Sequence, residues 1–265
     1  MPLLDVNGTQ LHYQIDGDGE QTVVMAHGLL MDSSMYDAQV PALRGRYRVI
    51  RYDHRGQGAS QATRDGLDMD TLCEDAAALI SALDAGPCHF VGMSMGGFVG
   101  LRLAARHPQL LRSLTLLDSS AWIEPRRVRL RFHAMRLGAW VFGLKPFIPA
   151  MLTLMFGASS LRDPAKAGLI AHWRERLASR PRQVLRAVKA VVQRTDVSAE
   201  LVNIRCPTLI VVGAEDVLTS PKHAAFMAKT VANATLVEIP AVGHSANMEA
   251  PEPVNAALLA HIGAG

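Results

Sequence analysis

The sequence predicts an α/β protein with a mostly parallel central sheet. Six apolar runs have the length of strands, and helical patterns lie between most of them. The runs are continuous rather than alternating, which is typical of strands covered on both faces. Because strands and helices alternate, we expect crossover connections between parallel strands. The expected strands are residues 22–26, 47–52, 89–93, 113–117, 208–212 and 235–239.

The order of the other elements suggests a core with one insertion. Residues 2–16 predict a two-stranded hairpin, because Asn7-Gly8 tolerates positive φ at both turn positions. Helical periodicity covers residues 70–83, 95–106, 221–231 and 252–261. Residues 121–200 have a helical pattern without a strand-like run. We therefore expect residues 1–120 and 201–265 to form the core and residues 121–200 to form a helical cap.

Length and composition exclude several classes of protein. The chain has 265 residues, of which 49% are hydrophobic and 19% charged. A chain of this kind is expected to bury about three quarters of the surface that it exposes when unfolded, which excludes disordered and fibrous proteins. The apolar stretch 137–156 contains Lys145, Pro146 and Pro149, which argue against a membrane-spanning helix.

The N-terminus and the cysteines indicate the compartment. Residues 1–26 lack a charged segment followed by an apolar run, so we do not expect them to act as an export signal. Cys73, Cys88 and Cys206 are too scattered for a disulfide framework and form no CxxC pair for zinc or redox chemistry. We therefore expect a cytoplasmic protein without a metal ion or a cofactor. The oligomeric state is left open, a homo-oligomer included.

The positive charge of the chain is concentrated in the expected cap. Residues 121–200 contain 15 Lys and Arg against 5 Asp and Glu, a net charge of +10, while the rest of the chain carries −7. Such a segment can bind nucleic acid or a membrane surface, attract anionic substrates, or form solvated helical faces. We favour solvated faces and expect no nucleic-acid partner, because no binding motif accompanies the charge.

A G-x-S-x-G motif carries the clearest chemical signal. Gly92-Met93-Ser94-Met95-Gly96 lies where an expected strand ends and an expected helix begins. A serine at such a turn is pushed out of the sheet, and larger side chains two residues before or after it would collide. The helix beginning at Met95 also directs its positive end at the serine. We therefore predict Ser94 as a nucleophile, against the alternative of an ordinary glycine-rich turn.

Serine needs a base, and the base needs an orienting acid. His244 follows the expected strand 235–239 in a loop near the C-terminus, and Asp216 follows the expected strand 208–212. Glu215 and Asp118 are rival acids, of which we rank Asp118 second after Asp216. The chosen residues follow the chain order Ser, Asp, His that is typical of hydrolases with this serine turn.

A tetrahedral intermediate also needs hydrogen-bond donors for its oxyanion. One expected donor is the backbone N–H of Met95, directly after the nucleophile. The second is the N–H of Leu29, in the loop that follows the expected strand 22–26. We expect His27 to shape this loop rather than to act as a second base.

At this point the sequence resembles the α/β-hydrolase superfamily over nearly the whole chain. The matching segments are 27–29, 52–60, the turn at Ser94, the Asp216 segment and 243–251. The resemblance implies an α/β-hydrolase fold with a helical cap after the sixth strand, at residues 121–200. It also assigns Asp53 and Arg55 to a structural turn.

The resemblance narrows the reaction. Haloalkane dehalogenases and epoxide hydrolases have an aspartate where Ser94 stands, and carbon–carbon bond hydrolases often have an aromatic residue where Ser245 stands. Residues 35–43 and 51–60 are similar to segments of bacterial carboxylesterases and 3-oxoadipate enol-lactonases. We therefore expect a serine hydrolase that acts on small to medium carboxylic esters or lactones.

Several alternatives remain open at the level of sequence. A cofactor-free perhydrolase, or haloperoxidase-like enzyme, would use the same three residues to transfer the acyl group to peroxide. A carbon–carbon bond hydrolase also stays open despite Ser245, and a ligand receptor could use the same fold without turnover. The expected substrate-binding residues are Leu29 and Trp122. Apolar side chains of the cap suggest a hydrophobic underside, namely Trp122, Trp140, Phe142, Phe147, Met151, Leu154, Met155 and Phe156.

Overall fold

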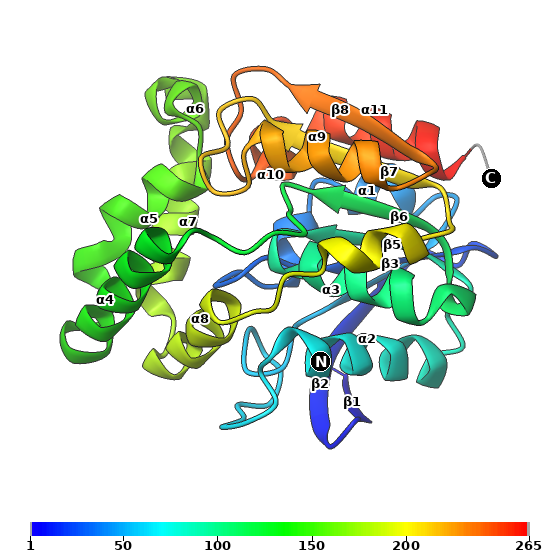
Figure 1. Ribbon diagram of the computed structural model, residues 1–265, viewed down its shortest axis with the longest axis horizontal. Helices are drawn as coiled ribbons and strands as arrows, with labels where there is room; N and C mark the ends of the chain where they lie inside the picture. The colour runs from blue at the N-terminus through cyan, green and yellow to red at the C-terminus, as the bar shows by residue number, and fades with distance from the viewer. Residues whose placement is uncertain (1, 264–265) are drawn as a thin grey trace.

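One eight-stranded sheet forms the centre of the protein (Figure 1). The computed structural model describes residues 2–263. The strand order is β1-β2-β4-β3-β5-β6-β7-β8, in which β1 and β2 pair antiparallel with their neighbours and all other pairs are parallel. The strands are β1 Leu3–Val6, β2 Thr9–Asp16, β3 Thr22–Ala26, β4 Arg48–Tyr52, β5 Cys88–Met93, β6 Leu111–Leu117, β7 Thr208–Gly213 and β8 Ala234–Ile239.

Helices cover both faces of the sheet. One face packs against α2, α3 and α9, and the other against α1, α10 and α11. Side chains of β3 alternate between the two faces, with Val24 and Ala26 on the first and Val23 and Met25 on the second. These helices are α1 Val40–Leu43, α2 Met69–Ala82, α3 Met95–Arg106, α9 Pro221–Thr230, α10 Ala246–Glu249 and α11 Pro251–Ile262. The predicted α/β class and parallel sheet are confirmed.

The last strand differs from the expectation of two covered faces. Strand β8 lies at the edge of the sheet, where it pairs with β7. Leu236 in this strand is 38% exposed, and Thr235 is also exposed. The apolar run predicted the strand correctly but its burial wrongly, because a continuous run does not distinguish a central strand from an edge strand.

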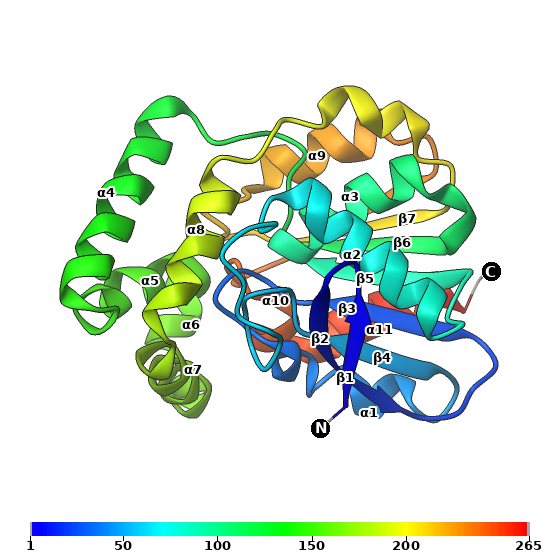
Figure 2. The same ribbon diagram turned by 90° about the horizontal axis from the view of Figure 1, so that it is seen from below.

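The segment between β6 and β7 forms five α-helices that lie to one side of the sheet in both views (Figures 1 and 2). They are α4 Arg126–Phe142, α5 Ile148–Met155, α6 Ala158–Arg162, α7 Ala167–Ser179 and α8 Leu185–Val192, and we call them the cap helices. Their apolar side chains join the hydrophobic cluster on the α1, α10 and α11 face of the sheet. The helical insertion follows the predicted pattern, and its division from the core as a separate unit stays a prediction.

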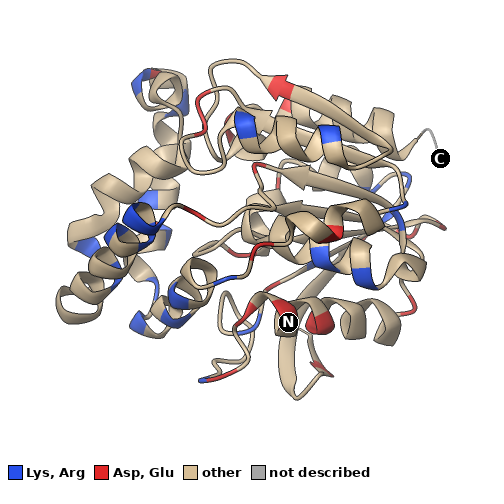
Figure 3. Cartoon of the chain, viewed as in Figure 1, with Lys and Arg blue, Asp and Glu red and all other residues tan. Residues whose placement is uncertain are grey.

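The cap helices carry many of the basic side chains, as Figure 3 shows. Some basic residues in and next to these helices are paired: Arg176 of α7 and Arg180 after it bind Asp32, and Arg194 after α8 binds Glu124. Others, such as Arg127 and Arg131 on α4, are exposed, as expected for a solvated face. Within residues 2–263 no helix has both the length and the apolar character needed to cross a membrane.

Candidate active site

Ser94 occupies a sharp turn between β5 and α3. Its backbone has φ 48° and ψ −108°, a conformation that non-glycine residues rarely adopt. The turn is held by the Ser94 N–H, which donates to the Leu117 carbonyl of β6 over 2.9 Å. Because such strain persists only where the surroundings enforce it, the fold presents the Ser94 hydroxyl at the carboxyl edge of the sheet.

The glycines of the motif permit this turn by close backbone approach. A Cβ on Gly92 would lie 2.3 Å from the Gly96 carbonyl oxygen, and a Cβ on Gly96 would lie 2.0 Å from the Ala26 carbonyl oxygen. Both obstacles are backbone atoms, which cannot turn aside as a flexible side chain can. The sequence prediction that these two positions require glycine therefore agrees with the structure.

We expect Gly92→Ala to lower the free energy of unfolding by about 2–4 kcal/mol, because the new methyl group forces backbone atoms apart. Gly168→Ala is the matched control: Gly168 lies in α7, and a Cβ added there would have no neighbouring atom within 4 Å. That change should stabilise the protein by about 0.5–1 kcal/mol, since alanine is the better helix former. Urea unfolding measures both, and equal effects of the two changes would contradict the steric explanation.

The structure brings the three predicted side chains into one hydrogen-bonded row. Ser94 Oγ lies 2.9 Å from His244 Nε2, and His244 Nδ1 lies 2.9 Å from Asp216 Oδ2. The loops after β5, β7 and β8 carry these residues, so all three meet at the carboxyl edge of the sheet. In this arrangement His244 Nδ1–H donates to Asp216, which leaves Nε2 free to accept the serine proton.

The charges of this row favour the protonated form of the histidine. Burial by itself would lower the pKa of His244, but the negative charge of Asp216 and its hydrogen bond outweigh burial, so the pKa is raised. Burial would likewise raise the pKa of Asp216, but His244 and Thr219 lower it. An imidazolium formed by proton transfer from Ser94 is therefore stabilised where it forms.

Thr219 is a member of this site that the sequence interpretation missed. Its hydroxyl donates to Asp216 Oδ2 over 2.7 Å, and its N–H donates to Asp216 Oδ1 over 3.0 Å. The Leu218 N–H also donates to Asp216 Oδ1, over 2.8 Å. The sequence could have indicated this contact. An aspartate at a turn commonly accepts hydrogen bonds from the backbone N–H groups two and three residues later, and Thr219 is the third residue after Asp216.

The two rival acids occupy other positions. Glu215 accepts hydrogen bonds from the N–H and hydroxyl of Ser159, at the start of α6, and so connects the cap to the loop after β7. Asp118 is fully buried and accepts from the N–H groups of Gly213 and Ala246 over 2.8 and 2.9 Å. Burial and the nearby Asp216 raise the pKa of Asp118. Asp118 therefore joins the two loops that carry Asp216 and His244.

The two predicted oxyanion donors have free N–H groups. Within residues 2–263, neither Leu29 N nor Met95 N donates a hydrogen bond, although Leu30 N donates to Gln57 over 2.8 Å and Met31 N donates to Gly28. Met95 is the first residue of α3, where backbone N–H groups have no partner within the helix. Leu29 and Ser94 line the same cavity. The geometry is compatible with an oxyanion hole made of these two groups.

His27 supports this loop. Its Nε2 accepts from the His54 N–H over 2.9 Å, so its Nδ1 carries the proton and donates to the Gly28 carbonyl over 2.7 Å. Burial lowers the pKa of His27, which keeps the ring neutral. This agrees with the expected structural role. Asp53 also has a structural role, since it accepts from the N–H groups of Ser33 and Ala59.

An apolar cavity of about 150 Å³ lies between the Ser94 turn and the cap helices. Leu29, Ser94 and His244 line it from the core, and α4, α5 and α8 line it from the cap. Four of the eight apolar cap residues expected at its wall are present, namely Phe147, Met151, Leu154 and Met155. An apolar cavity of this volume holds a group about the size of benzene.

The expectation for Trp122 is corrected. Trp122 does not belong to the cavity wall; its ring centroid lies 4.4 Å from that of Phe226 and 5.1 Å from that of His223, on α9. Trp140 and Phe142 also lie elsewhere, 42% and 72% exposed on the outer side of α4. Residue type predicted apolar contacts here, but the orientation of the helix decides which contacts are made.

Buried acids hold the cap against the site. Glu249 accepts from Gly157 N, at the N-terminal end of α6, and from Gly243 N and Ser245 N on either side of His244, over 2.9 to 3.2 Å. Asp32 accepts from Arg176 and Arg180 of the cap. Burial would raise the pKa of Asp32, but hydrogen bonds from Ser34 and the two arginines lower it. The cap is thus tied both to the His244 loop and to the Leu29 loop.

Comparisons with known proteins agree with this architecture. The profile of a family described as alpha/beta hydrolase fold matches residues 21–251. The chain belongs to this α/β-hydrolase family. A relative from Stutzerimonas stutzeri (strain A1501), which has the provisional name carbamate hydrolase RutD, is 31% identical over 95% of this chain and 96% of its own length.

Two further comparisons show how varied the named activities of similar hydrolases are. A protein of Mycobacterium tuberculosis (strain CDC 1551 / Oshkosh), provisionally named non-heme bromoperoxidase BpoC, is 31% identical over 94% of this chain and 96% of its own length. The crystal structure of the enol-lactonase from Burkholderia xenovorans LB400 has a TM-score of 0.91 and 28% identity, covering 98% of this chain and 99% of that one. This α/β hydrolase is therefore a hydrolytic enzyme whose substrate the family alone does not determine.

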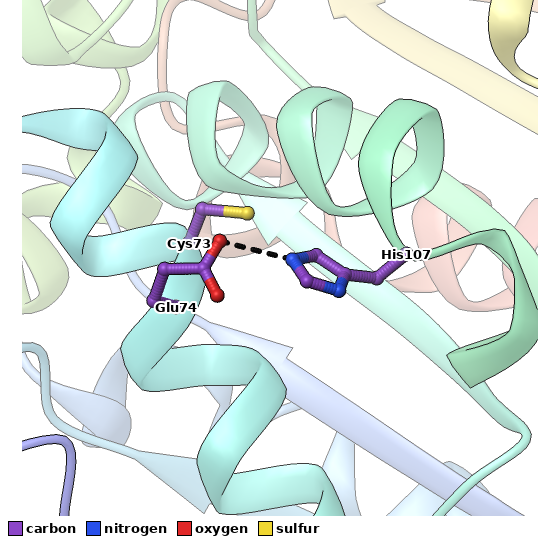
Figure 4. Close-up of side chains that lie close together, drawn as sticks. All are labelled: Cys73, Glu74 and His107. Carbon is purple, nitrogen blue, oxygen red and sulfur yellow. Dashed lines mark hydrogen bonds and ion pairs between the residues drawn. The ribbon is translucent and has the colours of Figure 1, made fainter.

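A second cluster of side chains in the hydrolase has residue types that bind metal ions in other proteins. The ligand atoms of Cys73, Glu74 and His107 lie within 4.8 Å of one another, at the contact between α2 and the end of α3 (Figure 4). Burial raises the pKa of the Cys73 thiol to about 12, which disfavours the thiolate that a metal needs. His107 Nε2 and Glu74 Oε1 already form a 2.9 Å pair. We assign this group to helix packing.

Proposed function

We propose that the protein is a serine hydrolase that cleaves carboxylic esters or lactones of small to medium size. The observation that carries this proposal is the continuous row from Ser94 Oγ through His244 to Asp216, which opens into an apolar cavity. Such a row converts a weak nucleophile into an effective one, because the base that accepts its proton is already in place. The apolar wall suits the hydrocarbon part of an ester or lactone.

The reaction begins when the Ser94 oxygen attacks the carbonyl carbon. The serine proton moves to His244 Nε2, and Asp216 stabilises the resulting imidazolium. The negative charge that develops on the carbonyl oxygen is stabilised by the N–H groups of Leu29 and Met95, where loss of one donor typically costs about 10²–10³ in turnover. The positive end of α3 adds to this stabilisation.

The intermediate then collapses in two stages. The carbon–oxygen bond to the alcohol breaks as His244 returns its proton to the leaving oxygen, which leaves an acyl group on Ser94. Water gives a proton to His244 and attacks the acyl carbon, and His244 then protonates the Ser94 oxygen as the acid leaves. For a lactone, acid and alcohol are the two ends of one product.

A substrate panel tests this proposal against the activities named for relatives. We expect 4-nitrophenyl butyrate and small lactones to be hydrolysed, and a fluorophosphonate to label Ser94 and stop the reaction. Phenyl carbamates and hydrogen peroxide with acetate are the comparison substrates. If a carbamate has a higher kcat/KM than every ester and lactone, the protein is a carbamate hydrolase instead. If peracid forms faster than the ester is hydrolysed, it is a perhydrolase. Labelling of Ser94 without turnover of any substrate would indicate a receptor.

A further inference from the structure

The cavity above Ser94 contains one cationic side chain that no acid of the protein neutralises. Within residues 2–263, Arg136 is the only Lys or Arg that lines this cavity. Its Nε is buried and has no hydrogen-bond partner, and no ion pair joins Arg136 to an acid in this part of the chain. Arg136 as a whole is half-buried, and within residues 2–263 its terminal nitrogens make no hydrogen bond, so they are free to bind a ligand in the cavity.

The helix orients Arg136 toward the cavity. Phe132, Met135, Arg136 and Ala139 of α4 all line it, and this spacing of three, one and three residues defines a single face of a helix. The other arginines of α4 do not belong to this wall, and Arg131 is exposed. Arg136 therefore stands as a charged group within the apolar inner face, apart from the solvated basic face of the cap.

The acidic residue of the same cavity is already occupied. Glu124 accepts from both terminal nitrogens of Arg194 over 2.7 and 2.9 Å, a paired geometry in which both carboxylate oxygens are used. Arg194 also donates to the Trp122 carbonyl over 2.7 Å, which fixes this pair in place. Glu124 is thus neutralised by Arg194, and the positive charge of Arg136 is left without compensation.

We propose that Arg136 binds a carboxylate of the substrate, so that the enzyme prefers esters or lactones that carry an anionic group at the end of the molecule away from the bond that is cleaved. This inference rests on the proposed function and specifies its substrate class. A guanidinium recognises a carboxylate through paired N–H groups, and the apolar surroundings of Arg136 strengthen that interaction. The cavity volume of about 150 Å³ leaves room for a short chain between the two groups.

The test compares esters that differ mainly in charge. One pair is the mono-4-nitrophenyl ester of glutaric acid and 4-nitrophenyl hexanoate, which places the carboxylate on the acyl side. The other pair is 4-acetoxybenzoate and its methyl ester, which places it on the alcohol side. The measured quantity is the kcat/KM for the anionic ester divided by the kcat/KM for its neutral partner. For at least one pair we expect Arg136→Met to lower this ratio by about 10- to 100-fold, the usual range for a hydrogen bond to a charged group.

Two further variants separate charge from packing. Arg136→Lys keeps the charge and should retain part of the ratio, whereas Arg131→Met, on the exposed side of α4, should leave the ratio unchanged. The proposal would be overturned if Arg136→Met lowered kcat/KM equally for the anionic and the neutral esters. It would also be overturned if Arg131→Met lowered the ratio as much as Arg136→Met does.

A binding measurement keeps the inference independent of turnover. In the Ser94→Ala background, calorimetry with the glutarate monoester should give a dissociation constant that rises about 10-fold or more when Arg136→Met is added, with a smaller change for the hexanoate ester. An unchanged dissociation constant would refute the role of Arg136. Hydrolysis that persists in Ser94→Ala would instead refute the proposed function, so the two failures are distinguishable.

Discussion

Ser94→Ala should lower the kcat for 4-nitrophenyl butyrate on the order of 10⁴- to 10⁶-fold, the largest effect that we expect from a single substitution. The change removes the only oxygen that lies within hydrogen-bond distance of His244 Nε2 among the described side chains of residues 2–263. Without it, no acyl-enzyme forms, and the oxyanion donors and the cavity can assist only a direct attack by water. Burst kinetics and fluorophosphonate labelling should disappear together.

Ser81→Ala provides the matched control for this experiment. Ser81 is an exposed residue of α2 whose hydroxyl donates only to the Ala77 carbonyl of its own helix. Its removal should leave kcat and the labelling unchanged. Thermal unfolding of both variants should remain close to that of the unsubstituted protein. Turnover retained by Ser94→Ala at more than a tenth of the original rate would remove this serine from the mechanism.

The second large effect concerns the choice between two buried acids. Asp216→Asn should lower kcat by about 10⁴-fold, because an amide NH₂ group facing His244 Nδ1 favours the wrong tautomer of the imidazole. Asp118→Asn should lower kcat by less than about 10-fold. It should instead lower the free energy of unfolding by about 1–3 kcal/mol, because one of its backbone donors, Gly213 N or Ala246 N, would then face another donor.

The pH profile separates these two roles. His244 acts as a base only when neutral, so kcat/KM falls as the pH drops through its pKa, which Asp216 and, to a lesser extent, Asp118 raise above the usual 6.5. Removing the negative charge of Asp216 lowers that pKa and moves the acid limb to lower pH, whereas Asp118→Asn removes less charge, because burial and Asp216 raise the pKa of Asp118 to about 8. We expect the larger shift for Asp216→Asn. A larger loss of kcat and a larger shift for Asp118→Asn would assign the orienting role to Asp118.

Local sequence patterns were sufficient to predict much of the active site. Gly92 and Gly96 have to be glycine because of backbone contacts within and next to the turn, so the pattern around Ser94 alone identified its geometry. Asp216 and His244 were found because they follow strands whose carboxyl ends meet at one edge of a parallel sheet. The free N–H of Met95 follows likewise from its place at the start of a helix.

The side-chain contacts of the cap were harder to predict from the sequence. Its helical pattern was visible, but Trp122, Trp140 and Phe142 were expected at the cavity and lie elsewhere. Hydrophobicity identifies side chains that avoid water without indicating which neighbour covers them. Arg136 appeared only as one of 15 basic residues in the segment, and its separate position on the inner face of α4 could not be read from charge counting.

The sequence by itself thus determined the parallel sheet, the serine turn and the order of the three residues that meet at its edge, because each depends on local patterns and on the regular geometry of strands and helices. The tertiary structure decided which acid faces the histidine, since Asp216 and Asp118 both follow strands and only their hydrogen bonds distinguish them. It also decided which cap residues surround the substrate, because that depends on how each helix is rotated against the core.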